Sequence, residues 1–217
     1  MHVVVFGANR GIGLEFCKRY KDSGFKVTAI CRQSSDELNQ VADTVYTSVD
    51  TTNLNKIQEV AEKVDEIDML VHVAGILRNE SLDAMNFETI GEQMAVNAMG
   101  PLMSVMGLLP KIKAGGKIGV LTSRMGSIAD NTSGGRYGYR MSKAALNAGL
   151  KSLAIDLKEK EIAVGILHPG YVRTDMTGGS GLIDTGESVW GLMKVLEKLN
   201  LQNTGTFWHT NGEELPW

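Results

Sequence analysis

Apolar residues gather in short runs, and the stretches between these runs repeat their apolar residues every three or four positions. The runs cover residues 2–6, 25–30, 44–49, 68–73, 116–121, 162–167 and 205–208. Runs of this length without strict alternation are typical of strands that are buried on both faces. The pattern therefore predicts about seven strands in a parallel sheet.

Helical spacing fills the intervals between the predicted strands. It predicts helices at residues 11–21, 36–41, 54–64, 87–109, 137–160 and 187–199. Pro101 lies inside the longest of these, where its missing N–H predicts a kink or a join between two helices. Strands that alternate with helices in this way predict a doubly wound, Rossmann-like α/β fold. No change of composition marks a boundary, so we expect a single domain over residues 1–217.

Composition and charge narrow the partners and the compartment. The 22 basic and 25 acidic side chains give a net charge of −3, which argues against a nucleic-acid partner. Neither a signal peptide nor an apolar run of membrane-spanning length occurs, which predicts a cytoplasmic protein without membrane contact. Cys17 and Cys31 are expected to be reduced thiols, and the four scattered histidines predict no metal site.

A glycine-rich turn joins the first predicted strand to the first predicted helix. Its sequence is Gly7-Ala8-Asn9-Arg10-Gly11-Ile12-Gly13. Glycines permit a tight turn and a close backbone approach, and the free N–H groups of the helix can hold a pyrophosphate. The spacing GxxxGxG is not the commoner GxGxxG, and a purely structural turn is the alternative. The strand–turn–helix context favours nucleotide binding.

The end of the second predicted strand indicates which nucleotide is bound. NAD enzymes usually place Asp or Glu there to bind the ribose 2′-hydroxyl. This chain has Cys31-Arg32 instead, and Arg10 adds a second cation from the glycine turn. Two cations without an acid favour a 2′-phosphate, so the sequence predicts NADP(H) in preference to NAD(H). The alternative is that Arg32 is a solvated loop residue.

A tyrosine, a lysine and a serine form a candidate catalytic set. Tyr139 and Lys143 are four residues apart at the start of a predicted helix, so they share one face, about 5–6 Å apart. A cation beside a phenol lowers the tyrosine pKa, which suits general acid–base chemistry near neutral pH. Ser123 follows the fifth strand, where a hydroxyl can polarise a carbonyl. Ser127 is the competing candidate for that serine.

These motifs occur in the order found in the short-chain dehydrogenase/reductase family, which the chain resembles over nearly its whole length. The matching residues are the glycine turn, Asp50, Ala74-Gly75, Asn97, Ser123, Tyr139 with Lys143, and Pro169-Gly170 with Thr174. The segment Gly134-Gly135-Arg136-Tyr137 and the tail Gly212–Trp217 resemble the C-factor and sniffer-type carbonyl reductase branch.

The resemblance implies a role for each member of the catalytic set. Tyr139 would protonate the carbonyl oxygen as hydride arrives, and Ser123 would hold that oxygen. Lys143 would bind the nicotinamide ribose hydroxyls and lower the Tyr139 pKa. Asn97 would hold a water for proton relay. The other implied cofactor contacts are Gly7, Asn9, Arg10, Gly11, Ile12, Gly13, Arg32, Asp50 at the adenine, Ala74, Gly75, and Pro169, Gly170, Val172 and Thr174 over the nicotinamide.

The chain departs from the family pattern at three places. His72-Val73 stands where the family usually has Asn-Asn, and we expect His72 to be a hydrogen-bonded sheet histidine without a catalytic role. Phe6 replaces the usual threonine before the first glycine. The segment after Thr174 is short and rich in glycine, so we expect a small substrate lid and an open or mobile active site.

The resulting hypothesis is an NADPH-dependent oxidoreductase that reduces a small aldehyde, ketone or quinone to an alcohol. The alternative is an NADP(H)-binding signalling or sensor protein of the same fold with little turnover. A nucleotide-sugar epimerase is disfavoured, because the chain after Gly170 is short for a separate substrate domain. Arg124, Arg136 or Arg173 could attract an anionic substrate, although a solvated surface role is the simpler interpretation. The helices over residues 87–109 and 137–160 permit a homodimer or homotetramer.

Overall fold

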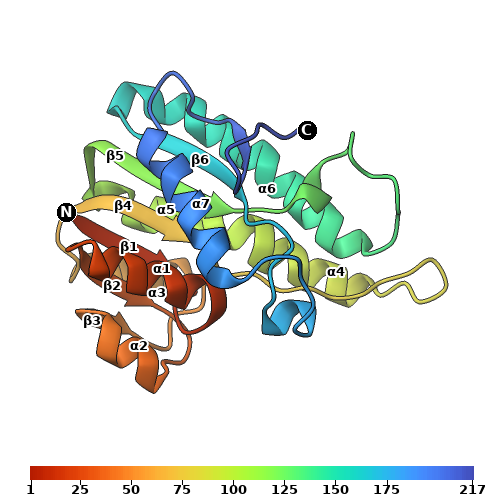
Figure 1. Cartoon of the computed structure of the whole chain (residues 1–217), viewed down its shortest axis with the longest axis horizontal. Helices are drawn as coiled ribbons and strands as arrows, with labels where there is room; N and C mark the ends of the chain where they lie inside the picture. The colour runs from red at the N-terminus through yellow and green to blue at the C-terminus, as the bar shows by residue number, and fades with distance from the viewer.

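Seven parallel strands form one sheet in the order β3-β2-β1-β4-β5-β6-β7 in the computed structural model, which describes residues 1–217 (Figure 1). The strands are β1 His2–Phe6, β2 Lys26–Ile30, β3 Thr44–Tyr46, β4 Ile67–His72, β5 Ile112–Leu121, β6 Ala163–His168 and β7 Phe207–His209. The chain returns from the β3 edge to place β4 beside β1, so the strand order reverses at this pair. The predicted doubly wound parallel fold is confirmed.

Helices cover both faces of the sheet, because each strand carries apolar side chains on both sides. Val3 and Val5 of β1 pack with α1 Gly11–Asp22, α2 Asp36–Val41 and α7 Thr185–Lys198. Val4 and Phe6 point the other way and pack with α3 Leu54–Ala61, α5 Gly100–Leu108 and α6 Tyr137–Asp156. Because alternate residues of a strand face opposite sides, burial on both sides requires the continuous apolar runs seen in the sequence.

The predicted helix over residues 87–109 is divided into three parts. It consists of α4 Phe87–Gln93, a π-helical turn Met94–Met99 and then α5, which begins just before Pro101. Pro101 has no N–H to bond the Asn97 carbonyl in an α-helical pattern, so the regular ladder cannot run through this point. The predicted join is present, and the wider turn that precedes it is an addition, of a kind frequent at functional sites.

Several boundaries differ from the sequence prediction for local reasons. β3 ends at Tyr46, because Ser48 has a left-handed backbone with φ 58°. β5 begins earlier, at Ile112, which pairs with Ile67 before a shift of register. Short 3₁₀ turns cover Leu109–Lys111, Arg124–Gly126, Leu157–Lys160 and Asp175–Thr177. None of the helices has both the length and the apolar character needed to cross a bilayer.

Candidate active site

The predicted site residues gather where the strands end. Gly7 follows β1, Gly75 follows β4, Ser123 follows β5 and Pro169 follows β6. Parallel strands bring their carboxyl ends to the same edge of the sheet, and the edge beside a reversal of strand order is where such folds bind ligands. In Figure 1 the loops after β4 and β5, drawn in yellow and green, extend beyond this edge.

The glycine turn is packed too closely to accept side chains. Gly7 has φ +78°, and a Cβ there would lie 2.6 Å from the Ala74 backbone nitrogen. A Cβ on Gly13 would lie 2.1 Å from the Gly7 carbonyl oxygen. The N–H groups of Gly11, Ile12 and Gly13 have no acceptor in the protein, and the first turn of α1 carries no acidic residue. Free donors at a helix N-terminus fit the pyrophosphate of a dinucleotide.

Of the residues expected at the adenosine end, Asp50 and Arg32 lie near each other, whereas Arg10 is paired with an acid elsewhere. Asp50 accepts hydrogen bonds from the Thr52 N–H at 2.9 Å and the Thr52 hydroxyl at 2.7 Å. These bonds, aided by the nearby Arg32 guanidinium, lower the Asp50 pKa below its ordinary value. Arg10 instead donates to Asp175 at 2.8 Å, in an ion pair with both side chains largely exposed. The expected pair of free cations is thus reduced to Arg32 in this structure.

Tyr139 and Lys143 lie on one face of α6, as their spacing predicts. The Lys143 ammonium is 5.8 Å from the centre of the Tyr139 ring and donates to the Leu121 carbonyl at 3.0 Å. Lys143 is only 4 % exposed, and this burial lowers its pKa to about 8. The lysine therefore joins the start of α6 to Leu121 at the end of β5. Ser123 follows Leu121 by two residues.

The Tyr139 phenol has a raised pKa, which differs from the expected direction. Burial raises the pKa, and the two opposing influences are a hydrogen bond with Ser123 and the Arg136 guanidinium. The spacing predicts that Lys143 lowers this pKa, but Lys143 is not among the groups that shift it, and its ammonium donates to the Leu121 carbonyl. The net result is that desolvation of the phenol outweighs its favourable neighbours.

The two candidate serines have different surroundings. The Ser123 hydroxyl accepts from the Met125 N–H at 3.1 Å and is the one that interacts with Tyr139. Ser127 accepts from the Asp130 N–H at 3.1 Å and serves a turn within the loop. Each hydroxyl accepts one backbone hydrogen bond in its own turn, and of the two only Ser123 influences the pKa of Tyr139.

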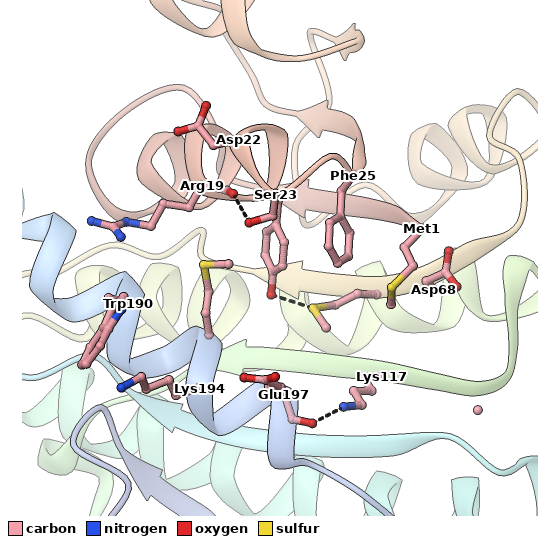
Figure 2. Close-up of a pocket in the computed structure, with 14 residues that line it drawn as sticks. Met1, Arg19, Asp22, Ser23, Phe25, Asp68, Lys117, Trp190, Lys194 and Glu197 are labelled. Carbon is pink, nitrogen blue, oxygen red and sulfur yellow. Dashed lines mark hydrogen bonds between the residues drawn. The ribbon is translucent and has the colours of Figure 1, made fainter.

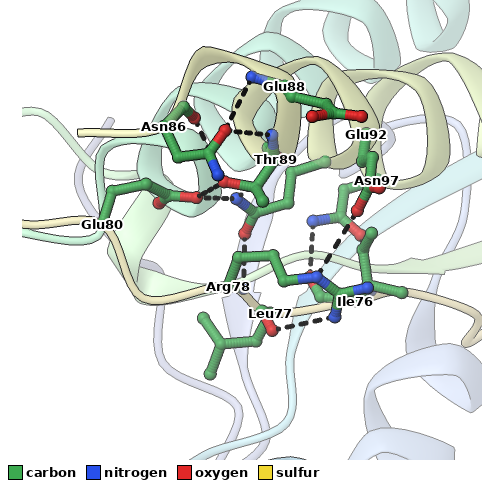
Figure 3. Close-up of polar contacts among 10 residues, drawn as sticks. Ile76, Leu77, Arg78, Glu80, Asn86, Glu88, Thr89, Glu92 and Asn97 are labelled. Atoms are coloured by element: carbon green, nitrogen blue, oxygen red, sulfur yellow. Dashed lines mark hydrogen bonds and ion pairs between the residues drawn. The ribbon is translucent and has the colours of Figure 1, made fainter. Parts of the chain in front are cut away.

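Asn97 lies in the π-helical turn, and its side chain is fully engaged. Its amide oxygen accepts from the Ile76 N–H at 2.8 Å, and its amide nitrogen donates to the Ile76 carbonyl at 2.8 Å (Figure 3). The second amide hydrogen goes to the Ser142 hydroxyl at 3.1 Å. The side chain has no donor left for a water, whereas the Asn97 backbone carbonyl lacks its usual partner because of Pro101.

The prediction that His72 is a hydrogen-bonded sheet histidine holds for only one of its two ring nitrogens. It is fully buried, and Nε2 lies 2.9 Å from the Thr51 hydroxyl, which lies 3.0 Å from that of Ser104. Nδ1 has no partner. Burial and the positive Lys143 lower the His72 pKa to about 3, so the ring is neutral near pH 7. The histidine is a sheet residue, as predicted, with one unsatisfied nitrogen.

A cavity of about 660 Å³ lies at the opposite edge of the sheet and contains none of the predicted site residues. It lies between the C-terminal end of α1 and α7, with Phe25, Trp190 and Lys194 among its lining residues (Figure 2). The Lys117 ammonium on its wall already donates to two carbonyls of α7. This cavity is therefore separate from the predicted site.

Two buried polar residues near the site were not predicted from the sequence. Glu80 is 3 % exposed and Gln93 is fully buried. Gln93 did leave a signal, because Ile90, Gln93 and Asn97 recur at helical spacing on one face. Nothing comparable marks Glu80, which lies in a polar loop.

Comparisons with known proteins agree with this geometry. The sequence profile of the family described as short chain dehydrogenase matches residues 1–181. A relative from Rhodococcus sp. (strain AD45), 1-hydroxy-2-glutathionyl-2-methyl-3-butene dehydrogenase, is 34% identical over 223 residues, which cover 99% of each chain. C-signal of Myxococcus xanthus is 38% identical over 154 residues, covering 70% of this chain and 93% of the relative.

Solved structures with a similar fold include carbonyl reductases. Carbonyl reductase Sniffer of D. melanogaster superposes with a TM-score of 0.92 at 27% identity, covering 100% of this chain and 99% of the other. An NADPH-bound carbonyl reductase from chicken fatty liver superposes with a TM-score of 0.88 at 28% identity, covering 100% and 98%. The chain is a member of the short-chain dehydrogenase/reductase family of oxidoreductases, in the branch that holds C-signal and the Sniffer-type carbonyl reductases.

Proposed function

We propose that the protein is an NADPH-dependent carbonyl reductase that converts an aldehyde, ketone or quinone to an alcohol, with Tyr139 as the general acid. The observation that carries this proposal is that Lys143 connects Tyr139 to the end of β5, where Ser123 follows, at the same edge of the sheet as the glycine turn. NADPH, when bound, supplies the hydride. The Tyr139 phenol donates a proton to the carbonyl oxygen, and the Ser123 hydroxyl donates a hydrogen bond to the same oxygen.

The Tyr139 phenol is protonated near neutral pH, as a phenol with an ordinary or raised pKa is. This protonated form is the one that a carbonyl reduction consumes. After proton transfer, Ser123 and the Arg136 guanidinium stabilise the phenolate. Lys143, with a pKa of about 8, carries most of its charge at pH 7 and would donate to the ribose hydroxyls. We therefore expect the reduction rate to fall as the pH rises through about 8.

The choice of NADPH over NADH rests on the end of β2. Arg32 stands where an acid would bind an unphosphorylated ribose, and such an acid would repel a 2′-phosphate. Several structural neighbours, the chicken carbonyl reductase among them, are described with NADP(H) bound. Arg10 would join Arg32 once a phosphate competes with Asp175. The residues proposed to cover the nicotinamide are Pro169, Gly170, Val172 and Thr174.

The test is NADPH consumption with a panel of aldehydes, ketones and quinones, with NADH as the comparison. We expect Tyr139→Phe to lower turnover about a hundred- to ten-thousandfold, because it removes the general acid. Its NADPH binding, measured by the cofactor fluorescence, should remain. Tyr46→Phe is the matched control, since its phenol bonds the Lys63 carbonyl far from the site. Turnover that survives in Tyr139→Phe would exclude the proposed acid.

The alternative function is NADP(H)-dependent signalling with little turnover. The similarity of the chain to C-signal supports this alternative. The same experiment separates the two functions. Tight NADPH binding without Tyr139-dependent turnover on any carbonyl would support the signalling role.

We also propose that the chain forms a homodimer or homotetramer through α5 and α6. These helices and the π-helical turn before α5 expose Met99, Met106, Met141 and Ile155, each more than half exposed. Light scattering after gel filtration measures the mass directly, and Met106→Glu with Ile155→Glu should convert an oligomer to a monomer.

A further inference from the structure

Glu80 is a buried carboxylate with hydrogen bonds to both of its oxygens. One oxygen accepts from the Thr89 hydroxyl at 2.7 Å and from the Gln93 amide at 2.7 Å (Figure 3). The other accepts from the Gly138 N–H at 3.2 Å. Burial acts to raise the Glu80 pKa, but these bonds outweigh it and the pKa is lowered. A buried charge is tolerated only when it is bonded in this way.

The start of α6 depends on this carboxylate because it has no cap of its own. The residue before the helix, Arg136, is left-handed with φ 50° and provides no side-chain hydrogen bond to the first turn. Glu80 supplies two bonds from the loop after β4. Its carboxylate accepts from Gly138, and its backbone carbonyl accepts from the Arg136 N–H at 2.8 Å. An anion at a helix N-terminus is also favoured by the helix dipole.

The same turn of α6 is pressed against α4. A Cβ on Gly138 would lie 2.4 Å from the Gln93 amide nitrogen and 3.0 Å from the Ile90 Cα. Gln93 in turn accepts from the Arg78 N–H at 2.9 Å. One hydrogen-bond network therefore fixes the loop after β4, helix α4 and the first turn of α6. Tyr139 is the residue that follows Gly138.

We infer that Glu80 is a positioning residue for Tyr139: it holds the first turn of α6 so that the phenol faces Ser123. This inference rests on the proposed reductase function. The Glu80 carboxylate bonds Thr89, Gln93 and Gly138, none of which is a predicted site residue, so its effect passes through Gly138 and Arg136. Loss of this hold should lower kcat and change cofactor binding little, because the glycine turn belongs to other elements of the fold and Lys143 keeps its own bond to the Leu121 carbonyl.

Glu80→Gln is the first test, because it keeps the shape and removes one acceptor. The carboxylate faces donors on both sides, so an amide must turn its NH₂ toward Gly138 or toward Thr89 and Gln93. We expect kcat to fall about tenfold or more, with the KM and the Kd for NADPH changed less than about threefold. Glu88→Gln, at an exposed glutamate on the neighbouring helix α4, is the matched control and should leave kcat unchanged.

The double variant Glu80→Gln with Gln93→Glu exchanges the two groups and restores the bonds between positions 80, 93 and Gly138. It gives up one bond, from the Gln93 amide to the Thr89 carbonyl at 3.2 Å, which lies within α4. The amide introduced at position 80 can accept from Gly138 through its oxygen, and its nitrogen can donate to the Thr89 hydroxyl and to the carboxylate introduced at position 93. The Thr89 hydroxyl can then donate to the Asn86 carbonyl, which it already contacts at 3.1 Å. The carboxylate at position 93 keeps the bond from the Arg78 N–H. We expect kcat to return to within about threefold of the wild-type value.

Hydrogen–deuterium exchange gives a measurement that does not require activity. The amides of residues 137–140 should exchange faster in Glu80→Gln and return to the wild-type rate in the double variant. Wild-type kcat in Glu80→Gln would overturn the inference, and so would a double variant that regains the wild-type melting temperature without regaining kcat. Absence of Tyr139-dependent turnover in the wild type would instead refute the proposed function. The exchange rates would still decide whether Glu80 holds the turn.

Discussion

The glycine turn and the α4–α6 corner support the same site by different means. The glycine turn, residues 7–13, is shaped by backbone that lies against backbone, as the 2.1 Å and 2.6 Å clashes of added Cβ atoms demonstrate. The α4–α6 corner, made of Glu80, Gln93, Asn97 and residues 136–138, is held by buried side-chain hydrogen bonds between segments far apart in the chain.

The difference decides what each region tolerates. A turn made of backbone contacts needs small residues at fixed places. A corner made of side-chain hydrogen bonds needs particular donors and acceptors, and one exchange leaves a buried group without a partner. The first region should therefore fail by steric clash, and the second by loss of alignment in a protein that still folds.

Gly7→Ala should have the largest effect of the substitutions that test this comparison. An alanine at φ +78° carries about 1–2 kcal/mol of left-handed strain. Its Cβ would also clash with the Ala74 backbone, which adds about 1–3 kcal/mol as the turn is pushed open. We expect a clearly lower free energy of unfolding in urea and loss of NADPH binding.

Gly24→Ala is the matched control for that substitution. Gly24 has almost the same backbone, φ +79°, but a Cβ there would meet nothing within 4 Å. It should show the strain alone, about 1–2 kcal/mol, with NADPH binding retained. Equal losses of stability in the two variants would mean that close backbone packing is not what makes the glycine turn.

Gly138→Ala tests the α4–α6 corner. Its Cβ would displace the Gln93 amide, which lies 2.4 Å away, and so disturb the bonds of Glu80. We expect kcat to fall about tenfold, while the Kd for NADPH stays close to the wild-type value. Gly91→Ala on α4, where a Cβ would meet nothing within 4 Å, should leave kcat unchanged and add up to about 1 kcal/mol of stability. A loss of NADPH binding in Gly138→Ala would show that the two regions are not separate.

The same division explains how much the sequence predicts. The seven strands, the sheet, the glycine turn and the arrangement of Tyr139 with Lys143 follow from patterns within a few residues of one another. Apolar periodicity, glycine spacing and an i,i+4 pair are local properties that the chain carries wherever it folds. These are the parts of the prediction that the structure reproduces.

The parts that could not be predicted depend on contacts across the chain. The sequence around Glu80 is typical of a surface glutamate. Only the fold brings its carboxylate to Gly138, 58 residues away in sequence. The pKa of Tyr139 depends on burial, which outweighs the neighbours that spacing reveals. Arg10 is a cation beside the predicted phosphate site, but its partner Asp175 comes from the loop after β6.

Two histidines with lowered pKa values, His72 at the end of β4 and His168 at the end of β6, predict an acid sensitivity. Burial lowers the pKa of His72 and of His168 to about 3, against an ordinary value of 6.5. The unfolded chain therefore binds more protons than the folded one between these values, and stability falls as the pH drops from about 6.5. Each histidine should contribute up to about 1.4 kcal/mol per pH unit.

Urea unfolding of the wild type and His72→Asn between pH 7 and pH 5 measures this dependence. We expect the substitution to remove about half of the slope that the two buried histidines produce. An unchanged slope would mean that His72 is hydrated or charged in the folded protein. Asparagine is also the residue that the family usually has at this position, so the substitution should preserve the sheet.

The ion pair of Arg10 and Asp175 should have the smallest effect, because it is the one polar contact over the glycine turn that lies in solvent. Exposed pairs contribute at most about 1 kcal/mol, so Asp175→Asn should leave the free energy of unfolding nearly unchanged. It should nevertheless free Arg10 for the 2′-phosphate and tighten NADPH about two- to fivefold, with NADH unaffected. Competition between the two anions predicts that the gain shrinks at high salt. Fluorescence titration of both cofactors measures it. An equal gain for NADH would mean that Asp175 acts on the shared part of the dinucleotide and not on its 2′-phosphate.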